Sequence, residues 1–333
     1  MLSSAVAVLR GLVVVFMTAA TVLMPFSHEK EQKITRKNEN CRASFAAISD
    51  THLKDNFIRL GMLEFGLRDM EKAKDRLDAV VFNGDITDHG YPEQWQGFTD
   101  TLLKYDISGN NIMVIGNHDT WGKDDDYEYT RKNFVKYSKE ATGRKISNVY
   151  FTTKINGYPV IVLGSEADHT YATISKKQIN WFAAEMKKAS KTGLPIFVFC
   201  HQSFNGTHGL PYNWELDKNE DDPTTGGIGD ASDDILRIVK KYKNVFFISG
   251  HIHAGMTVEG SDKTFYSSVE KHGNYTLVNL PCYEYPDVRR GGHISNGTGY
   301  VFEMYDGEVL LRARNFASGT WLEKYDVTVK LAK

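Results

Sequence analysis

Short apolar runs that alternate with amphipathic stretches constrain the fold of this chain more than any other feature. Each run has four to six residues and is rich in Val, Ile and Phe, which is typical of strands buried on both faces of a sheet. One amphipathic stretch opens with Ser175 and Gln178 at the spacing of a capping box. The alternation predicts an α/β layered fold. The apolar runs are residues 44–49, 79–83, 112–115, 159–164, 195–200 and 245–249, and the predicted helices are residues 57–77, 92–105, 175–189 and 232–242.

The last third of the chain has a different pattern. Residues 299–316 form two strand-like runs joined by Asp306-Gly307, which is a strong signal for a β-hairpin. No linker separates this part from the rest, so we expect one domain over residues 41–333. Two long connections, residues 120–148 and 202–231, show no clear periodicity and are expected to be functional loops.

Polar residues of a few chemical kinds follow five of the apolar runs directly. In open α/β sheets, ligands bind at the carboxyl ends of the strands. If these strands lie side by side, the side chains that follow them converge on one crevice. The side chains that would meet there are Asp50, His52, Asp85, Asn117, His201, His251 and His253.

The combination of imidazoles, carboxylates and one amide oxygen suits divalent transition metals such as Mn, Fe or Zn. Seven ligands exceed the need of one ion that keeps an open position, whereas two ions that share a carboxylate would use them all. Each short motif alone has an ordinary explanation, since a polar residue often follows a strand. The sequence Gly-Asn-His-Asp, however, should occur by chance in only about one such chain in a thousand. The ordered set therefore favours a two-metal site.

At this point the sequence resembles the calcineurin-like metallophosphoesterase superfamily. The matching blocks are DTH (50–52), GDITD (84–88), GNHD (116–119), a His at 201 after a strand, and GHIH (250–253). The resemblance spans about residues 44–254 and implies two mixed β-sheets packed as a sandwich and flanked by helices. It also implies that one metal is held by Asp50, His52 and His253 and the other by Asn117, His201 and His251, with Asp85 bridging both.

Two further residues match catalytic positions of the family. His118 matches the histidine that contacts the scissile phosphate and protonates the leaving oxygen, and Asp88 matches the acidic residue that pairs with it. A neighbouring carboxylate would orient the imidazole and raise its pKa. Asp119 has two interpretations: it bonds local backbone, as Asp in a turn commonly does, or it takes a direct part in catalysis.

The resemblance implies phosphoester hydrolysis, in which a hydroxide bridging two metals attacks phosphorus in line and His118 protonates the departing alkoxide. His89 stands where protein Ser/Thr phosphatases of the superfamily carry Arg, and Asp88 stands where purple acid phosphatases carry Tyr. The stretch GDITDHG looks most like the branch that contains cyclic-nucleotide phosphodiesterases. Phosphodiesters are the first expectation for the substrate. The alternatives are a phosphomonoesterase or nucleotidase with the same centre, and an inactive surface-binding protein.

The rim of the expected pocket would come from residues 120–148, 202–231 and 281–295. Arg289 and Arg290 either reach a phosphate or are merely solvated, and Tyr or Trp from residues 212–214 could stack on a base. A small phosphoester is the expected partner. The net charge of −2, with Lys and Arg spread along the chain, gives no nucleic-acid footprint.

Residues 1–27 differ from the rest of the chain. Arg10 precedes an apolar run of about 14 residues, which has the length of a signal-peptide core and is short for a membrane span. We expect a signal peptide or an N-terminal membrane anchor, followed by a polar linker over residues 28–40, and an extracytoplasmic location. A buried N-terminal helix is the alternative. With three cysteines, a bridge between Cys41 and Cys282 is one alternative for an oxidising compartment, and Cys200 is expected to pack as a small apolar residue.

Overall fold

The computed structural model describes residues 31–333 apart from residues 55, 124–125, 168–169, 216–224, 258–265, 291 and 294. The predicted signal or anchor segment, residues 1–27, lies outside the described residues. Within them, no helix has the length and apolar character that a membrane crossing requires. Residues 33–333 form one unit. Part of the predicted polar linker belongs to this unit, because Ile34 is buried and the backbone amide of Lys37 donates to the Glu303 carboxylate.

The first β-sheet combines parallel strands from the start of the chain with antiparallel strands from its end. Strands β1, β2 and β3 are parallel neighbours, and β10 pairs with β1 in antiparallel register. The predicted hairpin is confirmed, since β10 and β11 pair on either side of Asp306-Gly307. The order is β12-β11-β10-β1-β2-β3, with β13 on β11; the bounds are β1 Ala43–Ile48, β2 Ala79–Asn83, β3 Asn111–Val114, β10 Thr298–Tyr305, β11 Glu308–Asn315, β12 Thr320–Trp321 and β13 Val327–Lys330.

The second sheet has four parallel strands between two antiparallel edge strands. Its inner strands β5, β6 and β7 correspond to three of the predicted apolar runs, and each is buried along its whole length. The order is β4-β5-β6-β7-β9-β8; the bounds are β4 Phe151–Ile155, β5 Tyr158–Val162, β6 Ile196–Phe199, β7 Val245–Ser249, β8 Val269–His272 and β9 Tyr275–Asn279.

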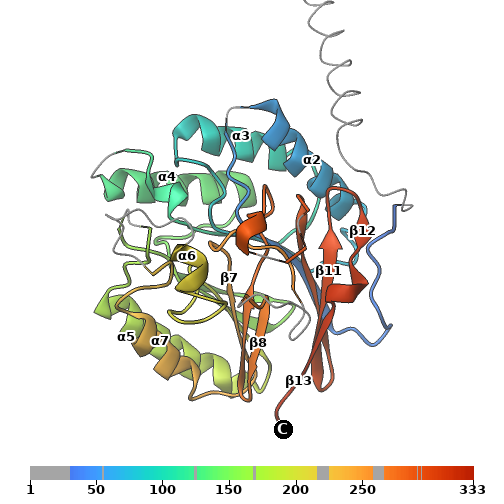
Figure 1. The fold of residues 1–333 in the computed structure, drawn as a ribbon, viewed down its shortest axis with the longest axis vertical. Coiled ribbons are helices and arrows are strands. Elements are labelled where there is room, and N and C mark those ends of the chain that lie inside the picture. Colours follow the sequence, from blue (N-terminus) through green and yellow to red (C-terminus); the bar gives the residue numbers. More distant parts are fainter. Residues whose placement is uncertain are drawn as a thin grey trace, which may run out of the picture. The chain divides into compact units, whose positions relative to one another are not determined.

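The two sheets pack face to face around an apolar core. Phe45 and Phe302 of the first sheet stack with ring centroids 4.6 Å apart, and Phe197 of the second sheet packs edge-on against Phe45 at 5.1 Å. Helices α2, α3 and α4 cover the outer face of the first sheet, and α5 and α7 cover the second (Figure 1). The predicted α/β sandwich of two mixed sheets flanked by helices is therefore confirmed.

All four predicted helices form, although three end earlier than expected. Ser175 caps α5 by accepting from the Gln178 amide at 3.2 Å, whereas the Gln178 side chain bonds to the backbone of Gly164 instead of completing the capping box. The bounds are α2 Phe57–Glu71, α3 Pro92–Leu102, α4 Tyr127–Thr142, α5 Lys176–Ala189, α6 Tyr212–Glu215 and α7 Ser232–Val239, with 3₁₀ turns at His118–Thr120, Ser190–Thr192, Val288–Arg290 and Glu323–Tyr325.

The expectation of an irregular loop over residues 120–148 is wrong, because helix α4 lies within it. This helix begins after the cap Asp126, whose side chain accepts from the Tyr129 amide, and ends at Gly143. Its buried face is narrow and mixes Phe134 with polar residues such as Thr130, so the apolar periodicity is weak. Packing against α3 and the first sheet stabilises this helix, which the pattern of apolar residues alone does not predict.

Candidate metal centre

The seven predicted ligands meet at one edge of the sandwich. They come from both sheets of the predicted sandwich. Asp50, Asp85 and Asn117 follow β1, β2 and β3 of the first sheet, whereas His201 and His251 follow β6 and β7 of the second. The centre therefore lies where the carboxyl ends of two packed sheets face each other.

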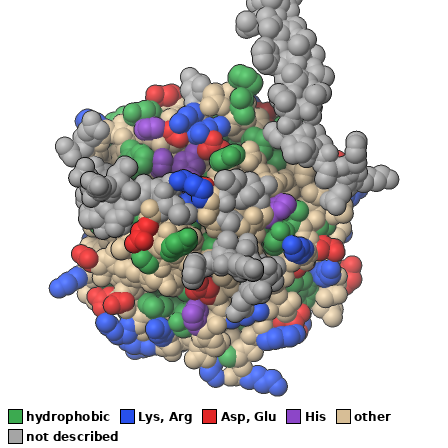
Figure 2. Space-filling model, in the orientation of Figure 1, with side chains coloured by type: hydrophobic (Ala, Val, Ile, Leu, Met, Phe, Trp, Pro, Cys, Tyr) green, Lys and Arg blue, Asp and Glu red, His purple; other side chains and the backbone are tan. Residues whose placement is uncertain are grey.

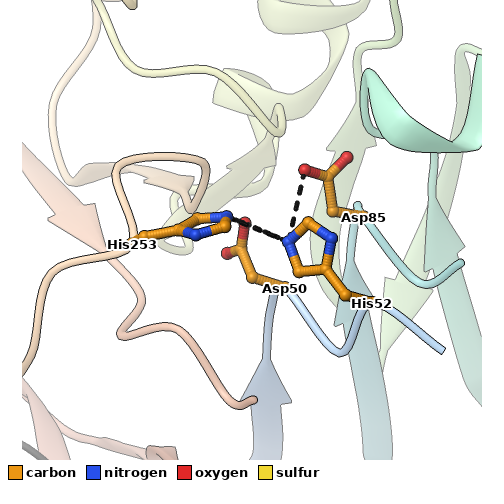
Figure 3. Close-up of side chains that lie close together, drawn as sticks. All are labelled: Asp50, His52, Asp85 and His253. Carbon is orange, nitrogen blue, oxygen red and sulfur yellow. Dashed lines mark hydrogen bonds and ion pairs between the residues drawn. The ribbon is translucent and has the colours of Figure 1, made fainter. Parts of the chain in front are cut away.

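One group of potential ligands consists of Asp50, His52, Asp85 and His253, whose ligand atoms all lie within 4.8 Å of one another. The Nε2 atoms of His52 and His253 are 2.9 Å apart, and His253 Nε2 is 3.3 Å from Asp50 Oδ1 (Figure 3). His52 Nε2 lies 3.7 Å from Asp85 Oδ2. Two imidazoles and two carboxylates thus aim at one small volume, which fits a divalent ion.

A second group consists of Asp85, His201 and His251, again within 4.8 Å. The amide oxygen of Asn117 and Nε2 of His251 are buried and make no hydrogen bond. Asp85 Oδ2 and His201 Nε2 are buried beside them and form an ion pair at 3.0 Å. Buried polar atoms are almost always hydrogen-bonded, so the two atoms without a partner beside this ion pair indicate a missing partner. Their chemistry suits a second divalent ion, and Asp85 belongs to both groups.

Backbone contacts set which nitrogen of His201 faces the centre. Its Nδ1 lies 2.8 Å from the carbonyl oxygen of Asn83 and must donate to it, which leaves the Nε2 lone pair for a metal. The Asp50 carboxylate accepts from the backbone amide of His251 at 3.1 Å, so it ties β1 to the loop after β7.

Burial and neighbouring charges shift the pKa values of the ligand histidines in different directions. Burial, helped by the neighbouring His253, holds the pKa of His52 well below its usual range, and burial with His201 does the same for the pKa of His251. These two imidazoles are neutral, as metal ligands must be. Burial also opposes protonation of His201, but Asp85 and Asp50 outweigh it and raise its pKa to about 9. Metal binding at this position would therefore release a proton.

The backbone at the centre is held in an unusual conformation. Eight non-glycine residues with positive φ are found in the described part of the chain, and five of them are predicted ligands. Such residues are uncommon outside glycine and cluster at functional sites. The five ligands are Asp50 (φ 59°), His52 (41°), Asp85 (47°), His251 (71°) and His253 (57°).

Glycines beside the ligands leave the room that the centre needs. A Cβ at Gly84 would overlap the imidazole of His201, and one at Gly116 would overlap the carboxylate of Asp85. Gly84 also has a φ of 84°, in the left-handed region that other residues rarely adopt. The lack of space for a Cβ at these two positions explains why the motifs GD and GN begin with glycine.

The structure corrects the predicted pairing of His118 with Asp88. Nδ1 of His118 lies 2.8 Å from the backbone carbonyl oxygen of Asp88, not from its carboxylate. The Asp88 carboxylate instead contacts Lys54 at 2.9 Å, Arg59 at 2.9 Å and the ring of His89 at 2.5 Å. These three partners engage the carboxylate, although one of its oxygens still lies within 4.8 Å of a ring nitrogen of His118.

Arg59 is a residue of the site that the sequence patterns did not reveal. Its Nη1 donates to the carbonyl oxygen of His52 at 2.5 Å and to Asp88 at 2.9 Å, while Nε contacts Glu284 at 2.5 Å. One guanidinium thus joins the segment after β1, the loop after β2 and the segment after β9. It lies on the first turn of α2, where nothing in the local sequence distinguishes it from a surface arginine.

Asp119 bonds local backbone, which is the first of its two predicted roles. Its buried carboxylate accepts from the amides of Thr87, Gly116 and Ile86 at 2.8, 2.9 and 3.3 Å, and from the Thr87 hydroxyl at 2.7 Å. Burial and the Asp85 carboxylate raise its pKa to about 7, against these donors, which favour the ionised form. Asp119 therefore connects the GDITD loop to the GNHD loop.

The expected rim residues are largely engaged with the protein itself. Trp214 stacks on His251 with ring centroids 4.7 Å apart and packs against the backbone of Gly226, yet it is partly exposed, so the stacking of Tyr212 or Trp214 on a base stays a prediction. Arg290 is buried and lies over the same ring at 5.4 Å. Arg289 pairs with Asp287 at 2.6 Å.

The three cysteines, all within the described residues, are buried free thiols, so no bridge joins Cys41 to Cys282. Cys200 packs in the apolar core under α5 and α7, as expected.

Comparison with known proteins decides the family. A model of the calcineurin-like phosphoesterases matches residues 43–255, which include all seven predicted ligands. The chain belongs to the calcineurin-like phosphoesterase family. The two groups of potential metal ligands lie within the matched residues.

Among curated proteins, the chain is similar to a probable glycerophosphodiester phosphodiesterase, GpdQ, of Arcobacter nitrofigilis, with 25% identity over 165 residues, 45% of this chain and 54% of the relative. It is 29% identical over 123 residues to a probable cyclic nucleotide phosphodiesterase of Rhodococcus erythropolis, covering 35% of this chain and 36% of the relative. The chain thus spans about half or less of the length of these relatives.

Solved structures share the fold of this phosphoesterase at low sequence identity. A dimetal phosphatase from Danio rerio superposes with a TM-score of 0.58 and 15% identity, covering 88% of this chain and all of that one. The purple acid phosphatase PPD1 from yellow lupin superposes with a TM-score of 0.59 and 13% identity, over 86% of this chain and 53% of that one.

Proposed function

We propose that this phosphoesterase hydrolyses phosphodiesters with two divalent transition-metal ions. The observation that carries the proposal is the set of buried ligand atoms at one place: Asn117 Oδ1 and His251 Nε2 have no hydrogen bond, and they lie beside the ion pair of Asp85 with His201. Leaving buried polar atoms unsatisfied would destabilise the fold, and a bound cation relieves this. Asp85 contributes to both groups of ligands, as a residue between two metals must.

When bound, the two ions would neutralise phosphate oxygens and activate a water molecule for in-line displacement. The roles of the protein side chains follow from their geometry. We assign Asp50, His52 and His253 to one ion and Asn117, His201 and His251 to the other, with Asp85 between them.

His118 is the proton donor in this proposal. The carbonyl oxygen of Asp88 can only accept, so His118 Nδ1 always carries hydrogen and Nε2 is the atom that gains and releases the proton. The ring packs edge-on against His52 with centroids 4.4 Å apart, which places it beside the first ligand group. From there Nε2 can protonate the oxygen that leaves phosphorus.

One observation favours diesters over monoesters. The curated relatives are named as a probable glycerophosphodiester phosphodiesterase and a probable cyclic nucleotide phosphodiesterase.

The test compares the rates at which bis-p-nitrophenyl phosphate and p-nitrophenyl phosphate are hydrolysed. The protein is first stripped of metal with a chelator and then loaded with Mn, Zn, Fe or Ni. We expect faster hydrolysis of the diester and loss of turnover when chelator is added again. Preference for the monoester would replace the phosphodiesterase proposal with a phosphomonoesterase. No turnover of either ester with any of the four metals would refute both.

A further inference from the structure

A group of partly exposed aromatic side chains lies on one side of the metal centre, next to His118. The ring of Trp121 packs on His118 with centroids 3.9 Å apart, and His89 lies edge-on to Trp121 at 6.1 Å. Tyr91 stacks on His89 at 5.5 Å with nearly parallel planes. We call Trp121, His89 and Tyr91 the aromatic wall.

The side chains of the aromatic wall are accessible to solvent. Tyr91 is 40% exposed, the side chain of His89 is 42% exposed, and Trp121 is partly exposed. Trp214 is also partly exposed, but it packs on His251 and not on His118. Figure 2 shows histidine side chains gathered with apolar ones on the upper part of the face in view.

The two loops that carry the wall are fixed against each other. A Cβ at Gly90 would overlap the backbone carbonyl of Asp119, and one at Gly122 would overlap the carbonyl of Gly90. The loops therefore approach backbone to backbone, and the bonds of Asp119 to the GDITD loop hold them together. A ligand that contacts the wall would meet rings that are already in place, which lowers the entropic cost of binding.

The position of the wall relative to the chemistry follows from the proposed function, on which this inference rests. If His118 protonates the leaving oxygen, that oxygen must come within about 3 Å of its ring. The group attached to that oxygen then lies against the ring that packs on His118, which is Trp121. His89 and Tyr91 extend the same surface outward.

We propose that the aromatic wall is a subsite for a planar aromatic substituent on the leaving-group side of the phosphoester. Offset or edge-to-face contacts with Trp121 and Tyr91 would bind an aryl or nucleobase ring. A small hydroxylated leaving group such as glycerol would gain little from the same surface. The subsite therefore distinguishes aromatic phosphodiesters from small alkyl ones.

The test measures binding without turnover. Phenylphosphonate and methylphosphonate carry the same anionic head on a P–C bond that hydrolysis does not break, and calorimetry gives their affinities for the metal-loaded protein. We expect phenylphosphonate to bind about tenfold more tightly than methylphosphonate, as an aromatic contact of this kind supplies. Trp121→Ala and Tyr91→Ala should each lower the ratio of the two affinities several-fold and leave the affinity for inorganic phosphate unchanged.

Tyr212→Ala is both the matched control and the test of the rival position, because Tyr212 is a tyrosine of similar exposure on α6, within the other segment that is predicted to stack on a base. It should keep the full preference. Tyr91→Leu removes the ring at an exposed position and tests the wall even if Trp121→Ala does not fold. Equal affinity of the wild type for both phosphonates, or an equal loss in Tyr212→Ala, overturns the subsite. The protein could instead prefer phenylphosphonate in a way that depends on Trp121 and yet hydrolyse no diester. That result supports the subsite and refutes the proposed function.

Discussion

Replacing Asp119 separates its structural role from a catalytic one. Its carboxylate accepts from three backbone amides and one hydroxyl on two different loops, all buried. In Asp119→Ala the hydroxyl of Thr87 can turn to another acceptor, but the three amides cannot. A buried donor left without a partner costs roughly 1–3 kcal/mol, and water entering the space of the carboxylate would recover part of this. Taking the lower limit for each amide gives a loss of about 3 kcal/mol, which removal of the buried charge beside Asp85 partly offsets.

The assay is urea unfolding of the metal-free protein, with metal content measured in parallel. At about pH 8 the wild-type carboxylate is ionised, since its pKa is raised only to about 7. Asp119→Asn keeps one oxygen and should lose roughly half as much stability as Asp119→Ala. Asp126→Ala serves as a control, because Asp126 is an exposed carboxylate that caps α4 through the amide of Tyr129 and should cause a smaller loss.

The reasoning also predicts the effect on metal binding. Asp119 accepts from the amide of Gly116, directly before Asn117, so its loss should weaken binding of the ion assigned to Asn117 more than of the other. If both variants unfold like the wild type and keep both metals, yet turnover falls by about 100-fold, then Asp119 acts in catalysis and the structural explanation is refuted.

Other expected outcomes concern the ligands and their supports. Asp85→Asn should lower the content of both metals, because this carboxylate belongs to both ligand groups; elemental analysis that finds one ion retained would contradict the bridging assignment. His118→Ala should keep both metals but slow substrates with poor leaving groups far more than nitrophenyl esters, and equal losses on both would argue against a general acid. Arg59→Ala should weaken metal affinity and lower Tm, and Arg59→Lys should do both to a smaller extent, because a lysine can replace only one of the contacts to His52, Asp88 and Glu284. Identical effects of the two variants would show that these contacts do not hold the ligand loop. Gly84→Ala should reduce metal content, since its Cβ would displace His201, and metal content equal to that of the wild type would mean that the loop moves freely.

Much of the fold could be predicted because its strands are short, apolar and buried on both faces. β2 and β7 begin and end at the residues that the pattern indicated, and the hairpin at Asp306-Gly307 follows from local turn chemistry. α4 was missed because its buried face is narrow and includes Thr130, so packing rather than periodicity reveals it.

The sequence could not predict which atom orients His118, nor that Arg59 joins three segments. Asp88 was paired with His118 through its carboxylate, but Lys54, Arg59 and His89 occupy that carboxylate, and the backbone carbonyl takes its place. These partners lie far apart in sequence or on other elements, so no local pattern indicates their contacts.

The sequence by itself determined which residues stand at the ends of the strands, because each ligand follows its strand directly and a strand buried on both faces is recognisable from composition. The tertiary structure decided which sheet each strand end belongs to, that Asp85 lies in both ligand groups, and that Trp214 packs on His251 whereas Trp121 packs on His118. The reason is physical. Strand direction and local turns depend on neighbours in the chain, whereas sheet pairing, side-chain orientation and burial depend on residues hundreds of positions away.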